Sequence, residues 1–464
     1  MIDATFAKSY FEKNRDAVLK SYYELVRIPT VGAQPIHLGD CARAAAWLKQ
    51  FLKPLGFEVE LITPSTEPPV PVVFAERKAK PRPGHSPKTV LFYGHYDVQP
   101  PDPLELWETP PFEPTLKEDG RVYARGAQDD KGQFFSFLCG LKALVESGAE
   151  LPNFKLLLEG EEENGSMGLF SLLPELTPRL HADVLLVCDT AAAPNGQPAI
   201  VAGLRGVQHY TIELKGADYD LHSGAHGGIA PNPAQGIAEL VASLHNPDGS
   251  IAVEGFNDCV CPPTEREIEE AKRGEITDEE YEKTTGVPPV GGERALLPVD
   301  RKCFRATIEV NGIHSGYGGE GSKTIIPSRA FAKISARLVP DQSPQHVFDA
   351  VKAHVEKHCP AGMTAEITEV HLGASGFRLP LDSPIFWIAK EELEKLDSKG
   401  PVFIWEGASI PIVSELRHRS GGAPLLVGFG SERDKIHSPN ESFSLDQFVR
   451  SMTWATLILQ ALAE

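Results

Sequence analysis

The segment Thr89-Val-Leu-Phe-Tyr93, followed at once by Gly94-His95-Tyr96-Asp97, decides the fold class. A short run of consecutive apolar residues is typical of a strand that helices cover on both faces. Similar runs recur at Phe154–Leu158 and Asp183–Cys188, and the apolar residues of Gly132–Glu146 have helical spacing. Strands that alternate with helices predict an α/β sandwich with a largely parallel sheet.

The pattern changes after about residue 204. Strands with alternating apolar and polar residues are expected at Val207–Leu214 and Ala332–Val339, and a helix is expected at Pro233–Leu244. Clean alternation of apolar and polar residues is typical of an antiparallel sheet with one solvated face, so this region predicts an α+β domain. Helical and apolar-strand patterns return from about residue 383. We therefore expect two domains, with residues 204–382 inserted into an α/β domain of residues 1–203 and 383–464.

Composition excludes several classes of protein. The 464 residues include 45 Lys and Arg against 64 Asp and Glu, so the formal net charge is −19 and a nucleic-acid partner is not expected. No apolar run approaches the roughly 18 residues that span a bilayer, and the first residues lack the pattern of a secretory signal, so we expect no membrane partner. Seven scattered cysteines fit buried thiols in a reducing compartment. We therefore expect a cytoplasmic protein.

Acidic and histidine residues gather where the strands of the α/β domain end. His95 and Asp97 are two residues apart in extended chain and point to one face, where a carboxylate can orient a metal-bound imidazole. Residues 159–163 place four carboxylates within five positions, and these repel one another unless a cation is present. Further clusters contain Asp129, Asp189 and His437. Each pattern alone also occurs as a buried hydrogen bond, a helix cap or a solvated loop.

The joint pattern points to metal chemistry. Two histidines and three carboxylates, carried by separate elements of one sheet, suit two closely spaced divalent ions. Oxygen and imidazole donors without thiolates favour Zn²⁺, with Mn²⁺ or Co²⁺ as further choices. Two such ions can acidify a water molecule and stabilise a tetrahedral intermediate, while a neighbouring carboxylate moves the proton.

Six motifs, in this order along essentially the whole chain, resemble the M20 family of dinuclear zinc peptidases and, within it, the carnosine-dipeptidase-like branch. They are Gly94–Pro100, Trp107–Phe112, Arg125–Gly132, Glu159–Ser166, Asp220–Gly224 and His437–Glu441. The resemblance implies a catalytic α/β domain with an inserted lid domain that often dimerises. It also implies a metal-dependent dipeptidase, acting as a homodimer on dipeptides or short peptides with a free C-terminal carboxylate.

The resemblance further implies roles for single residues. The implied metal ligands are His95, Asp129, Glu163, Asp189 and His437, with Asp129 bridging both ions and joined to Asp130 by a cis peptide bond. Glu162 would be the general base. Glu161 adds a third carboxylate, which would also allow an alignment with the family that is shifted by one residue. The following Asn-Gly-Ser fixes the alignment at Glu162 and Glu163. Asp97 would orient His95, and His222 would polarise the scissile carbonyl, often across the dimer.

The substrate contacts implied by the resemblance are Arg337, Asn232, Thr324 and Ser409. Arg337 matches the arginine that holds the substrate carboxylate, which suits a planar guanidinium. Trp405 departs from the family, because the loop that it opens commonly begins with arginine, and this change is expected to alter specificity. Two alternatives remain open: deacylation of N-acyl amino acids with the same metals, and a metal-binding regulator without catalytic activity.

Overall fold

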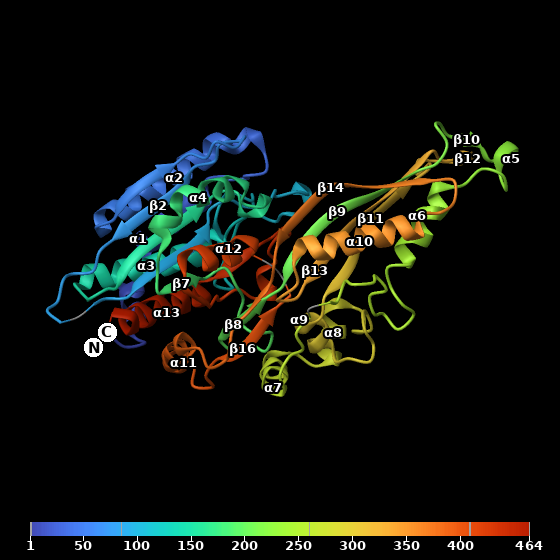
Figure 1. Ribbon diagram of the computed structural model, residues 1–464. Helices are drawn as coiled ribbons and strands as arrows, with labels where there is room; N and C mark the ends of the chain where they lie inside the picture. The colour runs from blue at the N-terminus through green and yellow to red at the C-terminus, as the bar shows by residue number, and fades with distance from the viewer. Residues whose placement is uncertain (1, 85, 259, 408–409, 464) are drawn as a thin grey trace.

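The computed structural model describes residues 2–84, 86–258, 260–407 and 410–463 (Figure 1). In this part of the chain, nine strands form the central sheet of the α/β domain. They are β1 (Glu58–Ile62), β2 (Val72–Arg77), β3 (Thr89–His95), β6 (Asn153–Glu159), β7 (Val184–Val187), β8 (Ala199–Leu204), β15 (Phe377–Arg378), β16 (Val402–Glu406) and β17 (Ala423–Leu426). The central pairs β6–β3, β3–β7 and β7–β17 are parallel, which confirms the predicted α/β fold with a largely parallel centre.

Helices bury this sheet. Successive residues of a strand face opposite sides, so the complete burial of Val90–Tyr93 means that both faces of β3 are covered. The helices are α1 (Phe6–Val26), α2 (Leu38–Leu52), α3 (Lys131–Ser147), α4 (Met167–Leu180), α11 (Pro384–Leu396), α12 (Pro411–Ser420) and α13 (Leu445–Ala463). Helix α13 packs against α1, α3 and α11, and α4 packs against α12. The sheet and these helices share one large apolar core.

A separate antiparallel sheet forms the inserted domain, as predicted. Its order is β11-β13-β9-β14. The strands and helices of this domain are β9 (Gly206–Lys215), β11 (Thr307–Ser315), β13 (Arg329–Leu338), β14 (Thr364–Ala374), α6 (Pro233–Ala242) and α10 (Pro344–His358). The domain has its own apolar core, which includes Ile212, Ile334 and Val351. At its far end lie β10 (Leu221–His222), α5 (Ser223–His226) and β12 (Ile325–Ile326), well away from the α/β domain in Figure 1.

Part of the predicted insert packs on the α/β domain instead of on the lid sheet. The segment contains α7 (Glu265–Gly274), α8 (Asp278–Thr285) and α9 (Pro298–Phe304). Helices α7 and α9 contact β16, and Ala271 and Phe304 belong to the larger core. This segment therefore ties the inserted domain to β16, the strand that contains Trp405. The limits of the insert at residues 204 and 382 stay a prediction.

A small sheet joins the C-terminal region to the entry of α3. It consists of β4 (Thr115–Leu116), β5 (Arg121–Tyr123) and β18 (Ser442–Ser444), in the order β18-β5-β4. The pairing of β18 with β5 brings Glu441 beside the loop that leads into α3. None of the helices described is both long and apolar enough to cross a membrane.

Candidate metal centre and active site

The candidate metal ligands meet at one edge of the central sheet. His95 is the last residue of β3 and lies opposite Glu159, the last residue of the parallel neighbour β6. Asp189 follows β7 by two residues, and Glu163 lies in the turn after β6. The carboxyl ends of parallel strands meet at the same edge, which is where α/β folds place their sites. The parallel pairing of β3 with β6 and with β7 therefore brings these three strand ends together.

Two donor clusters share the Asp129 carboxylate. His95 Nε2 lies 3.2 Å from Asp129 Oδ1 and 3.6 Å from Asp189 Oδ2. His437 Nε2 lies 2.9 Å from Asp129 Oδ2 and 3.2 Å from Glu163 Oε2. One oxygen of Asp129 thus faces each cluster, and the bond from Asp129 to Asp130 is cis, as expected.

These residues fit two divalent cations. In a tetrahedral site with metal–ligand bonds of about 2.0–2.1 Å, neighbouring donor atoms are roughly 3.3 Å apart. The donor separations of 2.9 to 3.6 Å agree with that spacing, and all donors are imidazole or carboxylate. In each cluster the donor atoms lie within 4.8 Å of one another.

Burial and mutual proximity shift the acid–base equilibria of this cluster. Burial alone lowers the pKa of His95, but hydrogen bonds with Asp129, Asp189 and Asp97 outweigh it and raise that pKa well above its usual value. Hydrogen bonds with Asp129 and Glu163 raise the pKa of His437 to about 10. Burial, together with neighbouring carboxylates, raises the pKa of Glu162 well above its usual range, and His95 only partly offsets this. Such a concentration of shifted groups is typical of a functional site.

Asp97 connects His95 to the turn that carries Glu162 and Glu163. Its Oδ1 lies 3.2 Å from His95 Nδ1 and accepts a hydrogen bond from the Glu162 backbone N–H at 3.2 Å. Its Oδ2 accepts one from the Glu163 N–H at 3.0 Å. The Glu162 carboxylate lies 3.9 Å from His95 Nε2. The Glu161 carboxylate instead accepts a hydrogen bond from Gly168 at the start of α4, at 3.0 Å. The structure therefore places Glu162 and Glu163, and not Glu161, beside the histidines.

Two residues to which the sequence reasoning gave no role also contact this centre. Glu441 is completely buried and accepts hydrogen bonds from the backbone of the loop that carries Asp129. Gln99 Nε2 donates to Glu163 Oε2 at 2.7 Å. Both belong to motifs that the family resemblance rests on, at Gly94–Pro100 and His437–Glu441. Their position inside those motifs was the signal that could have found them.

Within the chain, His222, Asn232 and Thr324 lie on or beside elements of the inserted domain, whereas the metal ligands lie on the α/β domain. His222 ends β10, Asn232 caps α6 through the N–H of Ala234, and the Thr324 carbonyl accepts from Ser223 beside β12. Strands β10 and β12 lie at the far end of the inserted domain (Figure 1), and α6 packs against β9, β11 and β13. Arg337 is on β13 near the start of β9, paired in register with Val207, and Ser409 lies outside the described residues.

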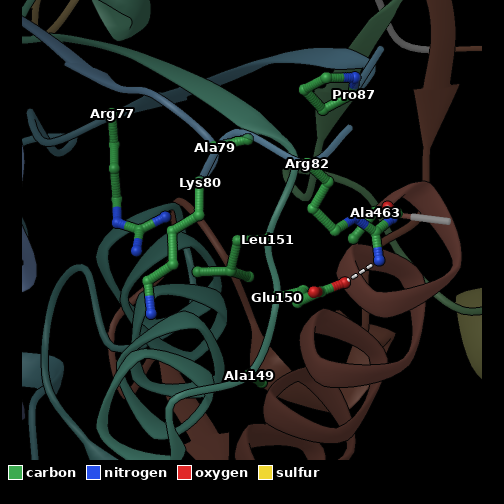
Figure 2. Close-up of a pocket in the computed structure, with 9 residues that line it drawn as sticks. All are labelled: Arg77, Ala79, Lys80, Arg82, Pro87, Ala149, Glu150, Leu151 and Ala463. Carbon is green, nitrogen blue, oxygen red and sulfur yellow. Dashed lines mark hydrogen bonds and ion pairs between the residues drawn. The ribbon is translucent and has the colours of Figure 1, made fainter. Parts of the chain in front are cut away.

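A small pocket lies at the edge of the sheet opposite the metal ligands (Figure 2). It lies beside the end of β2 and the residues before β3 and β6, and Arg77, Lys80 and Arg82 give it a basic lining. Arg82 pairs with Glu150, and Arg77 donates to the Leu55 carbonyl at 3.2 Å. Its cavity of about 10 Å³ holds about one water molecule, which is too small for a peptide substrate.

Known proteins resemble this chain over most of its length. The model of Peptidase family M20/M25/M40 matches residues 91–461. The chain belongs to this peptidase family. It is 29% identical to the Cys-Gly metallodipeptidase dug1 of Schizosaccharomyces pombe, over 95% of this chain and 94% of that protein. It is 30% identical to the Beta-Ala-His dipeptidase of Homo sapiens, over 94% of this chain and 88% of that protein.

Solved structures show the same relationship. The structure of the di-peptidase Dug1p from Saccharomyces cerevisiae has a TM-score of 0.85 at 26% identity, covering 99% of this chain and 98% of that chain. Human carnosine dipeptidase 1 has a TM-score of 0.83 at 28% identity, with the same coverage. The expectations of an M20 metallopeptidase of the dipeptidase branch and of its fold are confirmed. The relatives named here are dipeptidases, which favours peptide-bond hydrolysis over the deacylase alternative.

Proposed function

We propose that this chain cleaves dipeptides, or short peptides with a free C-terminal carboxylate, using two divalent metal ions. The observation that carries the proposal is the Asp129 carboxylate, whose two oxygens face two separate donor clusters. His95 and Asp189 would hold one ion, and Glu163 and His437 the other. The donor set suits zinc, and manganese or cobalt as further choices.

Glu162 is the proposed general base. When bound, the two ions would supply Lewis acidity and lower the pKa of water. Glu162 is close to His95 and largely buried, so its carboxylate can take the proton of the attacking water and pass it to the leaving amine. Asp97 would keep both His95 and the Glu162 backbone in place for this step.

Substrate recognition is proposed to involve both domains and a second subunit. Arg337 would bind the C-terminal carboxylate of the substrate, with Asn232, Thr324 and Ser409 as further contacts. His222 would donate a hydrogen bond to the oxyanion of the transition state. Because His222 lies at the end of the inserted domain remote from the metal ligands of its own chain, it would act in the site of a partner subunit, and the enzyme would be a homodimer.

The cysteines support a reducing compartment, and we place the protein in the cytoplasm. Cys41, Cys139, Cys188 and Cys303 are buried thiols. Among the described cysteines, all are free. Disulfide-free chains of this kind are typical of the cytosol.

The test is metal-restored hydrolysis. The purified chain is stripped with a chelator and assayed on a panel of dipeptides and of N-acetyl amino acids, before and after Zn²⁺ or Mn²⁺ is added. We expect cleavage of dipeptides to return with the metal. Metal-restored cleavage of the N-acetyl amino acids alone would instead establish the deacylase, and no hydrolysis by a chain that binds both ions would support the regulator.

A further inference from the structure

The acidic motif after β6 contains one carboxylate that the proposed mechanism does not use. Of the four carboxylates in residues 159–163, those of Glu162 and Glu163 lie beside the histidines, and that of Glu161 binds the start of α4. The fourth belongs to Glu159, the last residue of β6, which is 1% exposed and is in neither donor cluster. Burial of a carboxylate is unfavourable unless hydrogen bonds compensate for it, so the partners of Glu159 indicate its role.

Two hydroxyl groups donate to the same oxygen of Glu159. The Tyr93 hydroxyl donates to Oε1 at 2.8 Å, and the Ser166 hydroxyl donates to Oε1 at 2.9 Å. Tyr93 lies on β3, which pairs with β6, and Ser166 directly precedes α4. The other oxygen, Oε2, is buried and has no hydrogen-bond partner among the described residues. One oxygen of Glu159 therefore joins two neighbouring strands to the end of the turn that follows β6.

Ser166 does not act as an ordinary helix cap. A serine in this position normally accepts a hydrogen bond from an N–H group in the first helical turn, but the Ser166 side chain accepts none from α4. Its hydroxyl instead points back to Glu159. The φ angle of Ser166 is 57°, in the left-handed region that few residues other than glycine adopt. The hydrogen bond to Glu159 is thus a contact that can hold Ser166 in this conformation.

The turn that carries the active-site glutamates is held at both ends. At its start, the N–H groups of Glu162 and Glu163 donate to the Asp97 carboxylate. At its end, the Ser166 hydroxyl donates to the Glu159 carboxylate. Both carboxylates come from the edge of the central sheet, one just after β3 and the other at the end of β6. The position of Glu162 and Glu163 relative to this edge therefore depends on both anchors.

We propose that Glu159 is a positioning residue which, by accepting the hydrogen bond of Ser166, fixes the turn that carries Glu162 and Glu163. This role rests on the proposed function, which makes Glu162 the general base and Glu163 a metal ligand, and it adds the group that holds both in place. Among the proposed ligands, Glu163 alone lies on this turn. The ion of the Glu163 cluster should therefore depend on Glu159 more than the ion of the other cluster does.

The first test separates the acceptor atom of Glu159 from its charge. Glu159→Gln and Glu159→Met are both neutral and similar in length, but only glutamine keeps an oxygen that can accept from Tyr93 and Ser166. We expect kcat/KM for alanyl-glycine to be about 10–100-fold lower in Glu159→Met than in Glu159→Gln. Competition with a chromogenic chelator measures the two zinc-binding steps separately, and we expect the affinity of one step to fall by a similar factor.

A second variant breaks the same contact from the other side. Ser166→Ala removes the hydroxyl group, leaves Glu159 in place and removes no hydrogen bond that caps α4. We expect it to weaken the same zinc-binding step and to lower kcat/KM, even if Glu159→Met fails to fold. Ser171→Ala is the matched control, because Ser171 is an exposed serine of α4 whose hydroxyl donates to the Gly168 carbonyl at 2.7 Å. This control should keep both zinc affinities and kcat/KM.

The outcomes separate this proposal from the function on which it rests. Equal zinc affinities and equal kcat/KM in Glu159→Gln and Glu159→Met overturn the positioning role, and so does a Ser166→Ala enzyme that behaves like Ser171→Ala. Equal weakening of both zinc-binding steps shows a general loss of structure and overturns it as well. A wild-type chain that binds two zinc ions but cleaves no dipeptide overturns the dipeptidase proposal, while the zinc affinities of the variants still decide whether Glu159 positions Glu163.

Discussion

The Glu441 carboxylate accepts a hydrogen bond from the backbone N–H of Asp129, with 3.1 Å between N and Oε1. It also accepts from the N–H groups of Gly126 and Gln128 and, at 2.7 Å, from the guanidinium of Arg125. Glu441 follows His437 by four residues, and both it and Arg125 are buried. One side chain therefore fixes the loop of the shared ligand Asp129 relative to the loop of His437.

Glu441→Gln is predicted to weaken metal binding. The amide NH₂ group would face backbone N–H donors that now meet a carboxylate oxygen, so the Asp129 loop would move relative to His437. We expect the affinity for Zn²⁺ to fall by about 10–100-fold, the usual effect of losing a group that orients metal ligands. Competition with a chromogenic chelator measures this directly. Glu391→Gln, at an exposed glutamate of α11, is the control, and an unchanged affinity in Glu441→Gln would contradict the positioning role.

Glu162→Gln is predicted to remove catalysis while leaving metal binding in place. Glu162 is near His95 but is in neither donor cluster, so its loss takes away a proton acceptor and no ligand. We expect kcat/KM on a good dipeptide to fall by about 10²–10⁴-fold, the range for a general base, with metal content unchanged. Steady-state kinetics and metal analysis of the same preparation measure both.

The neighbouring Glu161 gives the matched control for that experiment. Its carboxylate accepts from Gly168 at the start of α4 and takes no part in the donor clusters. Glu161→Gln keeps a carbonyl oxygen for this hydrogen bond, so we expect kcat/KM close to the wild-type value. A severe loss of kcat/KM in Glu161→Gln, together with an active Glu162→Gln, would show that Glu161 is the general base.

Local patterns predicted the elements of this fold well, because apolar periodicity reflects burial. The runs at Thr89–Tyr93 and Phe154–Leu158 lie within β3 and β6, and the helix expected at Gly132–Glu146 lies within α3. The strand expected at Asp183–Cys188 is shorter in the structure, at Val184–Val187. Element ends depend on local hydrogen bonds that periodicity does not encode.

The contacts between distant segments could not be predicted from the sequence. Nothing in the acidic segment around α7 predicts that it packs on β16 instead of on the lid sheet. Glu441 lies in a recognised motif, yet its partners in Arg125–Asp129 precede it by more than 300 residues. Such pairings arise from tertiary packing, so the sequence identified the residue types of the site but not the contacts that hold them in place.

The metal-free chain is predicted to lose stability as pH rises through the neutral range. The pKa of His437 is raised to about 10 by hydrogen bonds with Asp129 and Glu163, whereas an unfolded histidine titrates near about 6.5. Between these pKa values the folded chain keeps a proton that the unfolded chain has lost. The contribution of His437 to the free energy of unfolding is therefore complete below about pH 6.5 and disappears as pH approaches about 10. Thermal unfolding of chelator-treated protein from pH 6 to 9 measures it.

Two comparisons test the cause of that pH dependence. His437→Asn has no proton to lose, so its unfolding temperature should decline less steeply than that of the wild type over the same range. Zn²⁺ binds deprotonated imidazole and carboxylates, so saturating metal should raise the unfolding temperature most at the alkaline end. Equal slopes for the metal-free wild type and His437→Asn would show that His437 does not carry the effect.

Mixing two inactive variants is predicted to restore activity if His222 acts across a dimer. Glu162→Ala lacks the base in its own site, and His222→Ala lacks the group that it would supply to its partner. In a mixed dimer, the site on the His222→Ala subunit has its own Glu162 and receives His222 from the other subunit, so it is complete. Random assembly of equal amounts makes half of the dimers mixed, each with one complete site, which gives about a quarter of wild-type activity. Co-expression with two affinity tags isolates the mixed dimer for assay. An inactive mixed dimer, or a fully active His222→Ala enzyme, would exclude a catalytic His222 from the partner subunit.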